Sequence, residues 1–407
     1  MSHTHRSTRR SVISQLCAAP AEEQQARGYV HTLREICQQP ELWEITARTM
    51  AGALDSIRPV VEEAGEVVLT GSGSSLYVAE CIAHAIQVGA GKPVRAMPSG
   101  ELLLLGPGAL PPGRPLLAVS FARSGNSPES AGLIRRLLED QPEVRHLVVT
   151  CNRQGRVAEA WGEGGAQRDP RVQVVTLDDR TCDRSLVMTS SFTSLAVAGL
   201  ALGCVRRPAD YLAGAEQAAR LAKPLLADFT DRLAEAAGGG FNRLIVLGDG
   251  GSFGAAREAA LKMLEMTDGR VVSMAETSLG FRHGPMCALH PNTLLLAFLS
   301  SDPVSRAYQV DLLDEIRRKG LGGTKIVVGA PAPREVLADR DVVVDLPGLD
   351  SLADDWAALL HVVAGQWLGF VRCRAEGLRP DEPAANGAIS RVVGEFPLHG
   401  VVAEVES

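Results

Sequence analysis

A loop rich in hydroxyl groups interrupts an apolar run near residue 120. The run Leu117–Phe121 is followed by the loop Arg123–Ser127, and a helical pattern begins at Ala131. Such a loop gathers unpaired backbone N–H groups at the positive end of a helix dipole, where the hydroxyls of Ser124 and Ser127 add further donors. This pattern predicts a binding site for a monophosphate group, although a simple turn with a serine N-cap has the same local signature.

Two more hydroxyl clusters follow predicted strands. One is Gly71–Ser75, after the strand Val67–Thr70, and the other is Thr181–Thr193, after the strand Val172–Leu177. Open α/β sheets bind ligands where the carboxyl ends of parallel strands meet. We therefore expect the three clusters to line one pocket.

The turn at 71–75 shares two glycines with the dinucleotide-binding fingerprint. Leu76 stands in place of the third glycine, and no acidic residue ends a strand about twenty positions later, where a ribose hydroxyl would need it. We therefore expect no nucleotide cofactor. The histidines and cysteines show no zinc-ligand spacing either, so we expect no metal.

Side chains suited to proton transfer occur in the second half of the chain. Glu258, Lys262 and Glu265 are neighbours on a predicted helix, a spacing that is also typical of a surface ladder of ion pairs. Downstream, His283 is followed by Gly-Pro and so lies in a turn, where an imidazole suits proton transfer near neutral pH. A carboxylate, an amine and an imidazole together suit acid–base chemistry on a small phosphorylated molecule.

The elements that must position these residues alternate between strand and helix, which predicts parallel βα units. The alternation occurs twice, with matching strands in the same order: Val67–Thr70 with Leu244–Leu247, Leu116–Ser120 with Leu294–Leu299, Leu147–Thr150 with Ile326–Gly329, and Val172–Leu177 with Val342–Leu346. Four matches in one order indicate an internal duplication. The predicted fold is α/β, with two tandem domains, each a doubly wound, flavodoxin-like parallel sheet flanked by helices.

The duplication suggests domain boundaries. We expect a disordered lead at 1–25, a first domain with N-terminal helices at 26–205, a helical linker at 206–240, a second domain at 241–375 and a C-terminal tail at 376–407. The tail is polar and contains prolines, so it is either disordered or laid over another part of the protein. Because the second half has Ser300–Arg306 where the first has its hydroxyl loop, we expect one phosphate site per chain.

Composition narrows the functional classes. The 407 residues are 45% hydrophobic and 22% charged, which is ample for two globular domains. The net charge of −7 gives no long-range attraction for nucleic acid or an anionic membrane, and no apolar run is long enough to span a membrane. The eight cysteines are scattered without a CxxC pair, which is typical of reduced thiols in the cytoplasm.

Taken together, the motifs resemble two sugar isomerase (SIS) folds in tandem. The resemblance covers nearly the whole chain, from about residue 32 to residue 393. The resemblance rests on Gly71–Ser75, Arg123–Ser127, the Leu-Lys-x-x-Glu helix at 261–265 and His283–Pro285. Within the SIS fold, the stretches Thr32–Pro40, Asp183–Ser191, Leu279–Pro285 and Arg391–Val393 resemble the AgaS type. Members of that type are galactosamine-6-phosphate deaminase/isomerases, also described as tagatose-6-phosphate ketose/aldose isomerases.

The resemblance also implies residue roles, by comparison with the isomerase half of glucosamine-6-phosphate synthase. Glu265 matches the proton-shuttling carboxylate, Lys262 the lysine one turn before it, and His283 the ring-opening histidine, which reaches in from the partner subunit. Contacts to phosphate and sugar are implied for Ser74, Ser75, Arg123, Ser124, Asn126, Ser127, Thr189, Ser190 and Arg391. The partner-supplied histidine implies a homodimer or a larger homo-oligomer.

This chain departs from the synthase at two places. Ala122 and Arg123 replace the Ser-Gln that opens the synthase phosphate loop, which fits the AgaS type and would place a guanidinium on the phosphate. The C-terminal lysine of the synthase has no clean match, because Ser390 or Arg391 falls near it. An arginine does not act as an amine base, so a role for Arg391 there is electrostatic.

The expected function is therefore that of an enzyme that converts an aldosamine 6-phosphate, with galactosamine 6-phosphate as the leading substrate, to tagatose 6-phosphate and ammonia. Two alternatives stay open. One is an enzyme that interconverts unaminated aldose and ketose phosphates or removes a sugar phosphate from an amine. The other is a sugar-phosphate sensor without turnover. The sequence leaves the stereochemistry at C4 of the sugar undetermined.

Overall fold

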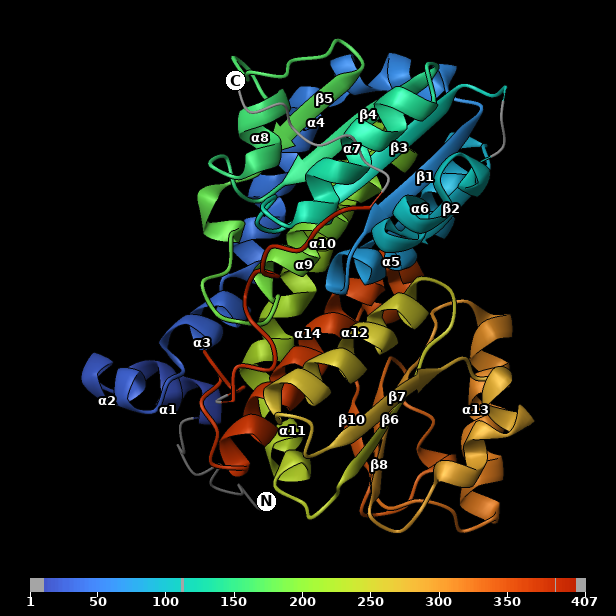
Figure 1. The fold of residues 1–407 in the computed structure, drawn as a ribbon. Helices are drawn as coiled ribbons and strands as arrows, with labels where there is room; N and C mark the ends of the chain where they lie inside the picture. Colours follow the sequence, from blue (N-terminus) through green and yellow to red (C-terminus); the bar gives the residue numbers. More distant parts are fainter. Residues whose placement is uncertain (1–10, 111–112, 385, 400–407) are drawn as a thin grey trace.

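The computed structural model describes residues 11–110, 113–384 and 386–399, and Figure 1 shows two lobes, each built around one sheet. The strands are β1 (Glu66–Gly71), β2 (Val94–Pro98), β3 (Leu116–Ala122), β4 (Val144–Thr150), β5 (Val172–Thr176), β6 (Arg243–Leu247), β7 (Val272–Glu276), β8 (Thr293–Phe298), β9 (Lys325–Val328) and β10 (Val342–Val344).

Helices connect and cover these strands. The α-helices are α1 (Val12–Ala18), α2 (Ala21–Ala26), α3 (Val30–Cys37), α4 (Gln39–Glu63), α5 (Ser74–Ala90), α6 (Ser99–Leu105), α7 (Pro128–Asp140), α8 (Arg156–Trp161), α9 (Ser190–Leu200), α10 (Pro208–Asp228), α11 (Thr230–Ala237), α12 (Gly251–Met266), α13 (Pro303–Arg318) and α14 (Asp354–Ala375). The 3₁₀ helices are η1 (Gly106–Ala109), η2 (Asp179–Thr181), η3 (Ala201–Cys204), η4 (Gly280–His283), η5 (Pro285–Ala288), η6 (Arg334–Val336) and η7 (Leu349–Ser351). None of the described helices is long and apolar enough to cross a membrane.

Each lobe contains a five-stranded parallel sheet. The strand order is β2-β1-β3-β4-β5 in the first lobe and β7-β6-β8-β9-β10 in the second, so every strand of one sheet has a counterpart in the other. This order is the flavodoxin-like one. The predicted α/β class, the tandem parallel sheets and the four matched strand pairs are confirmed. The edge strands β2 and β7 were not predicted, because both are partly exposed and lack the apolar run of a central strand.

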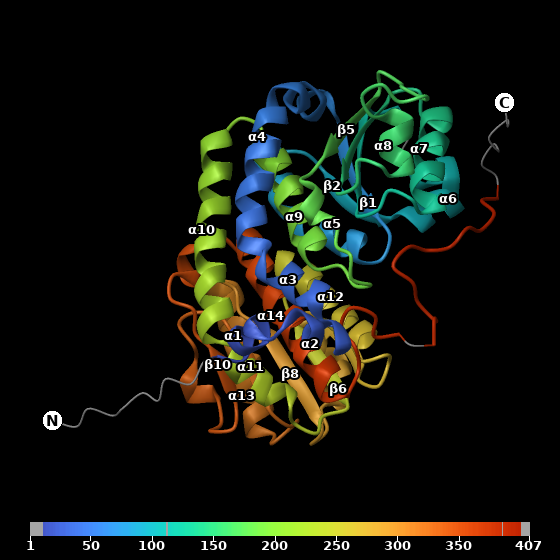
Figure 2. The same ribbon diagram turned by 90° about the vertical axis from the view of Figure 1, so that its left-hand side faces the viewer.

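A layer of helices lies between the two sheets. Figure 1 places α12 and α14 between the lobes, and Figure 2 shows α4 and α10 side by side along both of them. These helices share one apolar core with β1 and β3 of the first lobe and β6 and β8 of the second. Every residue of α14 from 357 to 373 is buried. Because the core is continuous, the two lobes form one folded unit.

The lobes approach most closely where α5 packs on α12. Gly254 faces the backbone of α5, and a Cβ at this position would lie 2.6 Å from Cys81 N and 2.9 Å from Tyr77 O, closer than two such atoms can pack. Three residues further along, the guanidinium of Arg257 lies 4.3 Å from the centre of the Tyr77 ring. This close packing brings the N-terminus of α5, at Ser74, against Lys262 in the C-terminal half of α12.

The N-terminal segment differs from the expectation of a disordered lead. Residues 1–10 lie outside the described part, but from Val12 onward the chain forms α1 and α2. Helix α1 buries Ile13 and Leu16, and the backbone N–H of Val12 donates to the Asp231 carboxylate at 2.6 Å. Two apolar side chains and this hydrogen bond hold α1 against α11.

The C-terminal tail is laid over the first lobe. Over the described residues 376–384 and 386–399 it contains no helix or strand. It begins beside the second lobe and α3 and then runs across the front of the first lobe, as Figure 1 shows in red and Figure 2 in profile. The Asp381 carboxylate accepts a hydrogen bond from Thr32 N at 2.8 Å, and Glu395 pairs with Arg156 of α8. The tail is thus anchored to α3 by Asp381 and to α8 by Glu395.

Candidate active site

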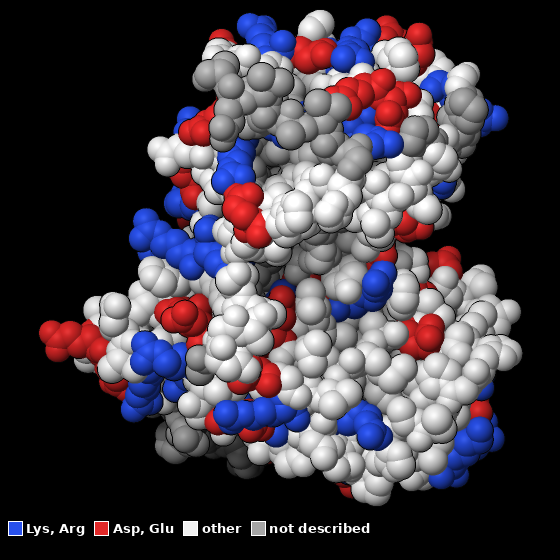
Figure 3. Space-filling view, viewed as in Figure 1, with Lys and Arg blue, Asp and Glu red and all other residues white. Residues whose placement is uncertain are grey.

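A cavity of about 470 Å³ opens at the carboxyl edge of the first sheet, a volume typical of small-molecule sites. Figure 3 shows that this face of the molecule is hollowed between the two lobes. The walls come from the loops after β1 and β3, the loop before α9, helix α12 and the tail. The lining residues are Ser72, Gly73, Ser74, Ser75, Phe121, Ala122, Arg123, Ser124, Gly125, Ser127, Glu129, Ser130, Leu186, Met188, Glu265, Ala388, Ile389, Ser390, Arg391, Val393 and Gly394.

The predicted phosphate loop forms one wall of this cavity. Gly125 has a φ of +62°, which residues with a Cβ rarely adopt, and the resulting turn lets Asn126 N donate to Ser124 Oγ at 3.2 Å. Ser127 is the N-cap residue of α7, but its hydroxyl accepts no backbone N–H. The hydroxyl of Ser127 and the N-terminus of α7 are therefore free to bind an anion, and Ser75 lines the same cavity.

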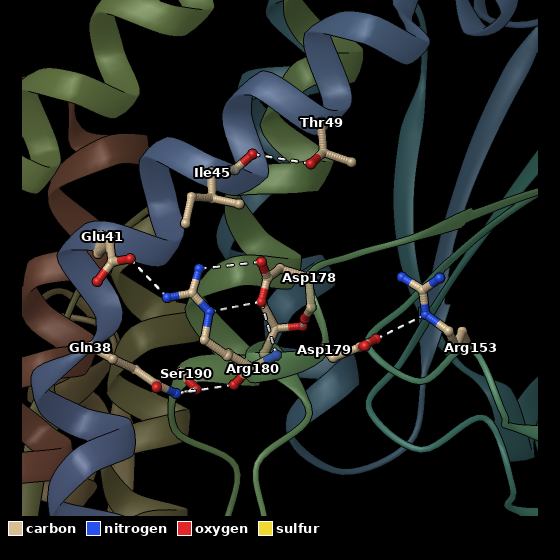
Figure 4. Close-up of polar contacts among 10 residues, drawn as sticks. Gln38, Glu41, Ile45, Thr49, Arg153, Asp178, Asp179, Arg180 and Ser190 are labelled. Atoms are coloured by element: carbon tan, nitrogen blue, oxygen red, sulfur yellow. Dashed lines mark hydrogen bonds and ion pairs between the residues drawn. The ribbon is translucent and has the colours of Figure 1, made fainter.

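Three residues expected to contact the ligand lie outside the cavity wall. The side-chain oxygen of Asn126 accepts the first backbone N–H of α8 at 2.9 Å. Thr189 is fully buried, and its hydroxyl has no partner among the described residues. The Ser190 hydroxyl donates to Asp183 and accepts from Gln38 Nε2 at 2.9 Å, and Figure 4 shows this contact beside Arg180. These three residues belong to the loops that form the wall, but they do not line the cavity themselves.

Two buried carboxylates shape the loop before α9. Asp183 accepts hydrogen bonds from the backbone N–H groups of Thr189 at 2.7 Å and Ser191 at 2.8 Å, and so caps the helix. Glu35 accepts from Arg184 N at 2.6 Å. Burial, together with the charge of Asp183, raises the pKa of Glu35 to about 7. Both carboxylates therefore hold the loop in shape and do not face the cavity.

Two arginines fasten the tail to this loop. Arg123 donates to Leu186 O at 2.8 Å and also to Arg391 O. Arg391 in turn donates from Nε to Asp183 O at 2.7 Å, and its Nη2 lies 3.3 Å from Cys182 Sγ. Burial lowers the pKa of Arg123, and the charge of Asp183 opposes that shift. Both arginines line the cavity, but these donors are directed at main-chain oxygens and at sulfur.

Lys262 stands at the centre of a buried cluster of charges. Its Nζ lies 3.2 Å from Glu258 Oε1 and 3.2 Å from Ser74 Oγ, and it also pairs with Glu265. Lys262 and Glu258 are fully buried, whereas the Glu265 side chain is 22% exposed and lines the cavity. The spacing of these three residues is therefore that of a buried cluster and not of a surface ladder.

Burial determines the charges in this cluster. Desolvation raises the pKa of Glu258 to about 7, although the nearby Lys262 lowers it. Desolvation alone would lower the pKa of Lys262, but the charges of Glu258 and Glu265 outweigh it and raise the pKa overall. Lys262 therefore keeps its proton. It contacts the fully buried carboxylate of Glu258 and the carboxylate of Glu265, which opens to the cavity. A fixed ammonium at this place can stabilise negative charge on a bound molecule.

His283 lies apart from this cluster. It is exposed at the end of η4, in the second lobe, and is not among the residues that line the cavity. Within one chain, the structure therefore brings together Glu265, Lys262 and most of the predicted phosphate-binding residues, and it leaves His283 outside.

Sequence reasoning did not select Glu129, which lines the cavity. The available signal was its place in the first turn of α7, two residues after Ser127. Ser72 and Glu258 were recognised within their motifs but were given no role of their own. For Glu258 the signal for burial was the set of small residues around it, Ala255, Ala256, Ala259 and Ala260, which is typical of a helix packed on other helices and not of an exposed face.

The cavity joins two chemically different ends. One end offers hydroxyls and a helix N-terminus, which bind an oxyanion. The other end offers the Glu265 carboxylate beside the Lys262 ammonium, which suits removal of a proton next to a polarised carbon. A small molecule held by a phosphate at the first end would extend toward Glu265.

Proteins with names that refer to sugar-phosphate enzymes are similar to this chain over most of its length. A Streptomyces coelicolor protein named AgaS is 37% identical over 380 residues, which are 91% of this chain and 96% of that protein. The Escherichia coli D-galactosamine-6-phosphate deaminase AgaS is 32% identical over 375 residues, covering 90% of this chain and 95% of that one. The crystal structure of tagatose-6-phosphate ketose/aldose isomerase from Escherichia coli superposes with a TM-score of 0.81 at 29% identity, covering 90% and 96% of the two chains. No family model matches the chain.

Proposed function

Because the chain belongs to the AgaS family, we propose that it is an enzyme that converts D-galactosamine 6-phosphate to tagatose 6-phosphate and ammonia. The observation that supports this function best is the single cavity that joins an anion-binding loop to a carboxylate beside a buried ammonium. The phosphate binds far from the reacting carbons and supplies binding energy that orients them.

Glu265 performs the proton transfer in this proposal. Its carboxylate removes the proton from C2 of the opened amino sugar and returns it to C1, while the amine nitrogen gives up one proton and the C1 oxygen takes one up. The C1 aldehyde and C2 amine thereby become a C1 hydroxyl and a C2 imine. Water then adds to the imine carbon, and ammonia leaves as the C2 carbonyl of the ketose forms. Because the enolamine intermediate carries negative charge on the C1 oxygen, the Lys262 ammonium stabilises it.

Ring opening must precede that step, and we assign it to His283. Since His283 is exposed and outside the cavity of its own chain, we propose that it enters the cavity of a second copy. The working form is then a homodimer or a larger homo-oligomer. All eight cysteines are free thiols, which fits our proposal that the enzyme works in the cytoplasm.

Ammonia release tests the proposal directly. Purified protein is incubated with galactosamine 6-phosphate and, separately, with glucosamine 6-phosphate, and ammonia and ketose phosphate are measured together. We expect equal amounts of ammonia and tagatose 6-phosphate from the first sugar, and a loss of both in Glu265→Gln. Interconversion of unaminated sugar phosphates without ammonia release would favour the simple isomerase instead.

A further inference from the structure

We propose that Glu129 selects the configuration of the substrate at C4, by accepting a hydrogen bond from the C4 hydroxyl. This inference rests on the proposed function and adds a specificity residue to it. Glu129 and Glu265 are the two carboxylates among the described residues that line the cavity. Glu265 is committed to proton transfer, so the presence of a second carboxylate in an anion-binding cavity needs an explanation of its own.

Glu129 is held in place by a chain of hydroxyl groups. The Ser72 hydroxyl donates to Glu129 Oε1 at 3.2 Å, and the Ser99 and Ser72 hydroxyls are hydrogen-bonded to each other. A serine has one hydroxyl proton, so when Ser72 donates to Glu129, Ser99 must donate to Ser72. The hydroxyls of Ser99 and Ser72 therefore orient one carboxylate oxygen of Glu129. These two serines directly follow β2 and β1.

The other carboxylate oxygen has no donor. Glu129 Oε2 is shielded from solvent and has no hydrogen-bond partner among the described residues. An oxygen that is removed from water without a partner is destabilising, and a buried site keeps such a group when the ligand supplies the missing donor. Phosphate oxygens donate nothing at neutral pH, so the donor must be a hydroxyl or an amine of the sugar.

The position of Glu129 identifies which part of the sugar it meets. It lies in the first turn of α7, the helix whose N-terminus forms the phosphate end of the cavity. Its partner Ser72 lies two residues before Ser74, which bonds Lys262 at the proton-transfer end. Glu129 is thus placed between the C6 phosphate and the C1–C2 atoms. The hydroxyls on the intervening carbons of the opened sugar are those at C3, C4 and C5, and the one at C4 is the one whose configuration distinguishes galactosamine from glucosamine.

Two non-reacting ligands test this assignment. They are the C1-reduced forms of galactosamine 6-phosphate and glucosamine 6-phosphate, which are C4 epimers and cannot isomerise. Their dissociation constants are measured by calorimetry with the wild type, Glu129→Ala and Ser72→Ala, and inorganic phosphate reports whether the phosphate end is intact. Glu139→Gln is the matched control, because Glu139 is exposed on the same helix.

We expect the wild type to bind the galacto ligand at least about tenfold more tightly than the gluco ligand, since the epimeric C4 hydroxyl of the gluco ligand points away from Glu129 and leaves its carboxylate oxygen without a donor. In Glu129→Ala this ratio falls to about one with phosphate affinity kept, and in Ser72→Ala it falls partway. Glu139→Gln keeps the wild-type ratio.

Two results would overturn the assignment of Glu129 and leave the proposed function standing: equal binding of both epimers by the wild type, or an undiminished galacto preference in Glu129→Ala. If Glu129→Ala no longer binds phosphate, Ser72→Ala decides, and an unchanged ratio in that variant overturns the assignment. The proposed function itself fails if neither reduced amino sugar binds the wild type more tightly than inorganic phosphate does.

Discussion

At Lys262, an ammonium group lies in the protein interior and is balanced by groups that the same helix and the start of α5 provide. Removing a charge from water costs several kcal/mol, and the cost is offset only while each buried charge keeps its partner. Glu258 has no route to solvent, so its role is to keep Lys262 charged and in place, while Glu265 faces the cavity. In the proposed mechanism, Glu258 therefore positions Lys262, and Lys262 in turn orients the carboxylate of Glu265.

Lys262→Met should therefore destabilise the protein strongly. The substitution leaves Glu258 buried beside a neutral side chain, and we expect the free energy of unfolding to fall by about 3–5 kcal/mol. The double variant Glu258→Gln/Lys262→Met removes both buried charges and should recover much of that loss. Urea unfolding of the three proteins checks this. A double variant as unstable as Lys262→Met would mean that the charge on Glu258 is not the cause.

The pKa of Glu258 predicts a pH dependence of stability. Its pKa is raised from 4.5 in the unfolded chain to about 7 in the folded protein, because burial disfavours the charged form. The folded state thus binds this proton more tightly, so its stabilising effect is complete below pH 4.5 and is lost as the pH rises to about 7. Between these limits we expect the wild type to lose about 3 kcal/mol more stability than Glu258→Gln. Parallel pH profiles of unfolding free energy for the two proteins would contradict this.

Spacing alone placed Glu258, Lys262 and Glu265 on one face of a helix but left a surface ladder of ion pairs open, and the resemblance to the synthase singled out Glu265 and Lys262. Neither of these signals revealed that the guanidinium of Arg123 is directed at main-chain oxygens, since its partner Arg391 lies in the tail, far along the sequence. Nor did they separate Ser127, whose hydroxyl is free at the cavity, from Ser190, whose hydroxyl is used by Asp183. Local sequence shows which groups are present, but long-range contacts decide which of them remain available.

At the scale of elements, the site depends on how closely α5 and α12 pack. Ser74 begins α5 in the first lobe, and Lys262 lies on α12 in the second, yet their polar atoms are 3.2 Å apart. Gly254 permits this distance, because a larger residue would collide with the α5 backbone. The distance between two helices from different lobes thus sets the distance between the anion-binding wall and the reactive cluster.

Gly254→Ala tests this dependence. The added methyl group must push α5 away from α12, so we expect a loss of about 1–3 kcal/mol in unfolding free energy and a fall in kcat. The control is Gly52→Ala, in the exposed interior of α4, where a Cβ meets no atom within 4 Å. That change should stabilise the protein by about 0.5–1 kcal/mol and leave kcat unchanged. Equal kcat in both variants would show that the helix distance is not critical.

Strands with an apolar run were predictable, including the partly exposed edge strands β5 and β10, and strands without one were not. The central strands β1, β3, β4, β6 and β8 read as continuous apolar runs because helices cover both of their faces. The edge strands β2 and β7 contain polar residues and carry no such run. Helix α1 was overlooked for a similar reason: it is short, and its order comes from packing against α11.

At the scale of the whole molecule, a duplicated fold has become one catalytic unit with two unlike halves. In the first lobe the hydroxyl loops stay open to a ligand. At the matching edge of the second lobe, Asp354 accepts from Ser301 N at 2.7 Å and Asp249 accepts from Ser278 N at 2.9 Å. At this edge, carboxylates of the protein thus accept hydrogen bonds from the backbone N–H groups that an anion would otherwise use.

The assembly proposed for His283 predicts recovery of activity on mixing. Glu265→Gln and His283→Ala should each be inactive as pure proteins, the first in proton transfer and the second in ring opening. After unfolding and refolding together, mixed dimers contain one site with both residues intact, so about a quarter of all sites should be active. The mixture is compared with a co-refolded sample of Glu265→Gln and a Glu265→Gln/His283→Ala double variant, which has no intact site. Activity no higher than in that control would place His283 outside the site of a second copy.

The fate of the C2 proton tests the central claim, that Glu265 carries it from C2 to C1 in this cavity. Galactosamine 6-phosphate labelled with deuterium at C2 is converted by the enzyme, and the product is examined by NMR during the first turnovers. We predict tagatose 6-phosphate that retains part of the deuterium at C1, formed together with an equal amount of ammonia, and neither product from Glu265→Gln. Product with no deuterium at C1, or ammonia release that persists in Glu265→Gln, would contradict the account.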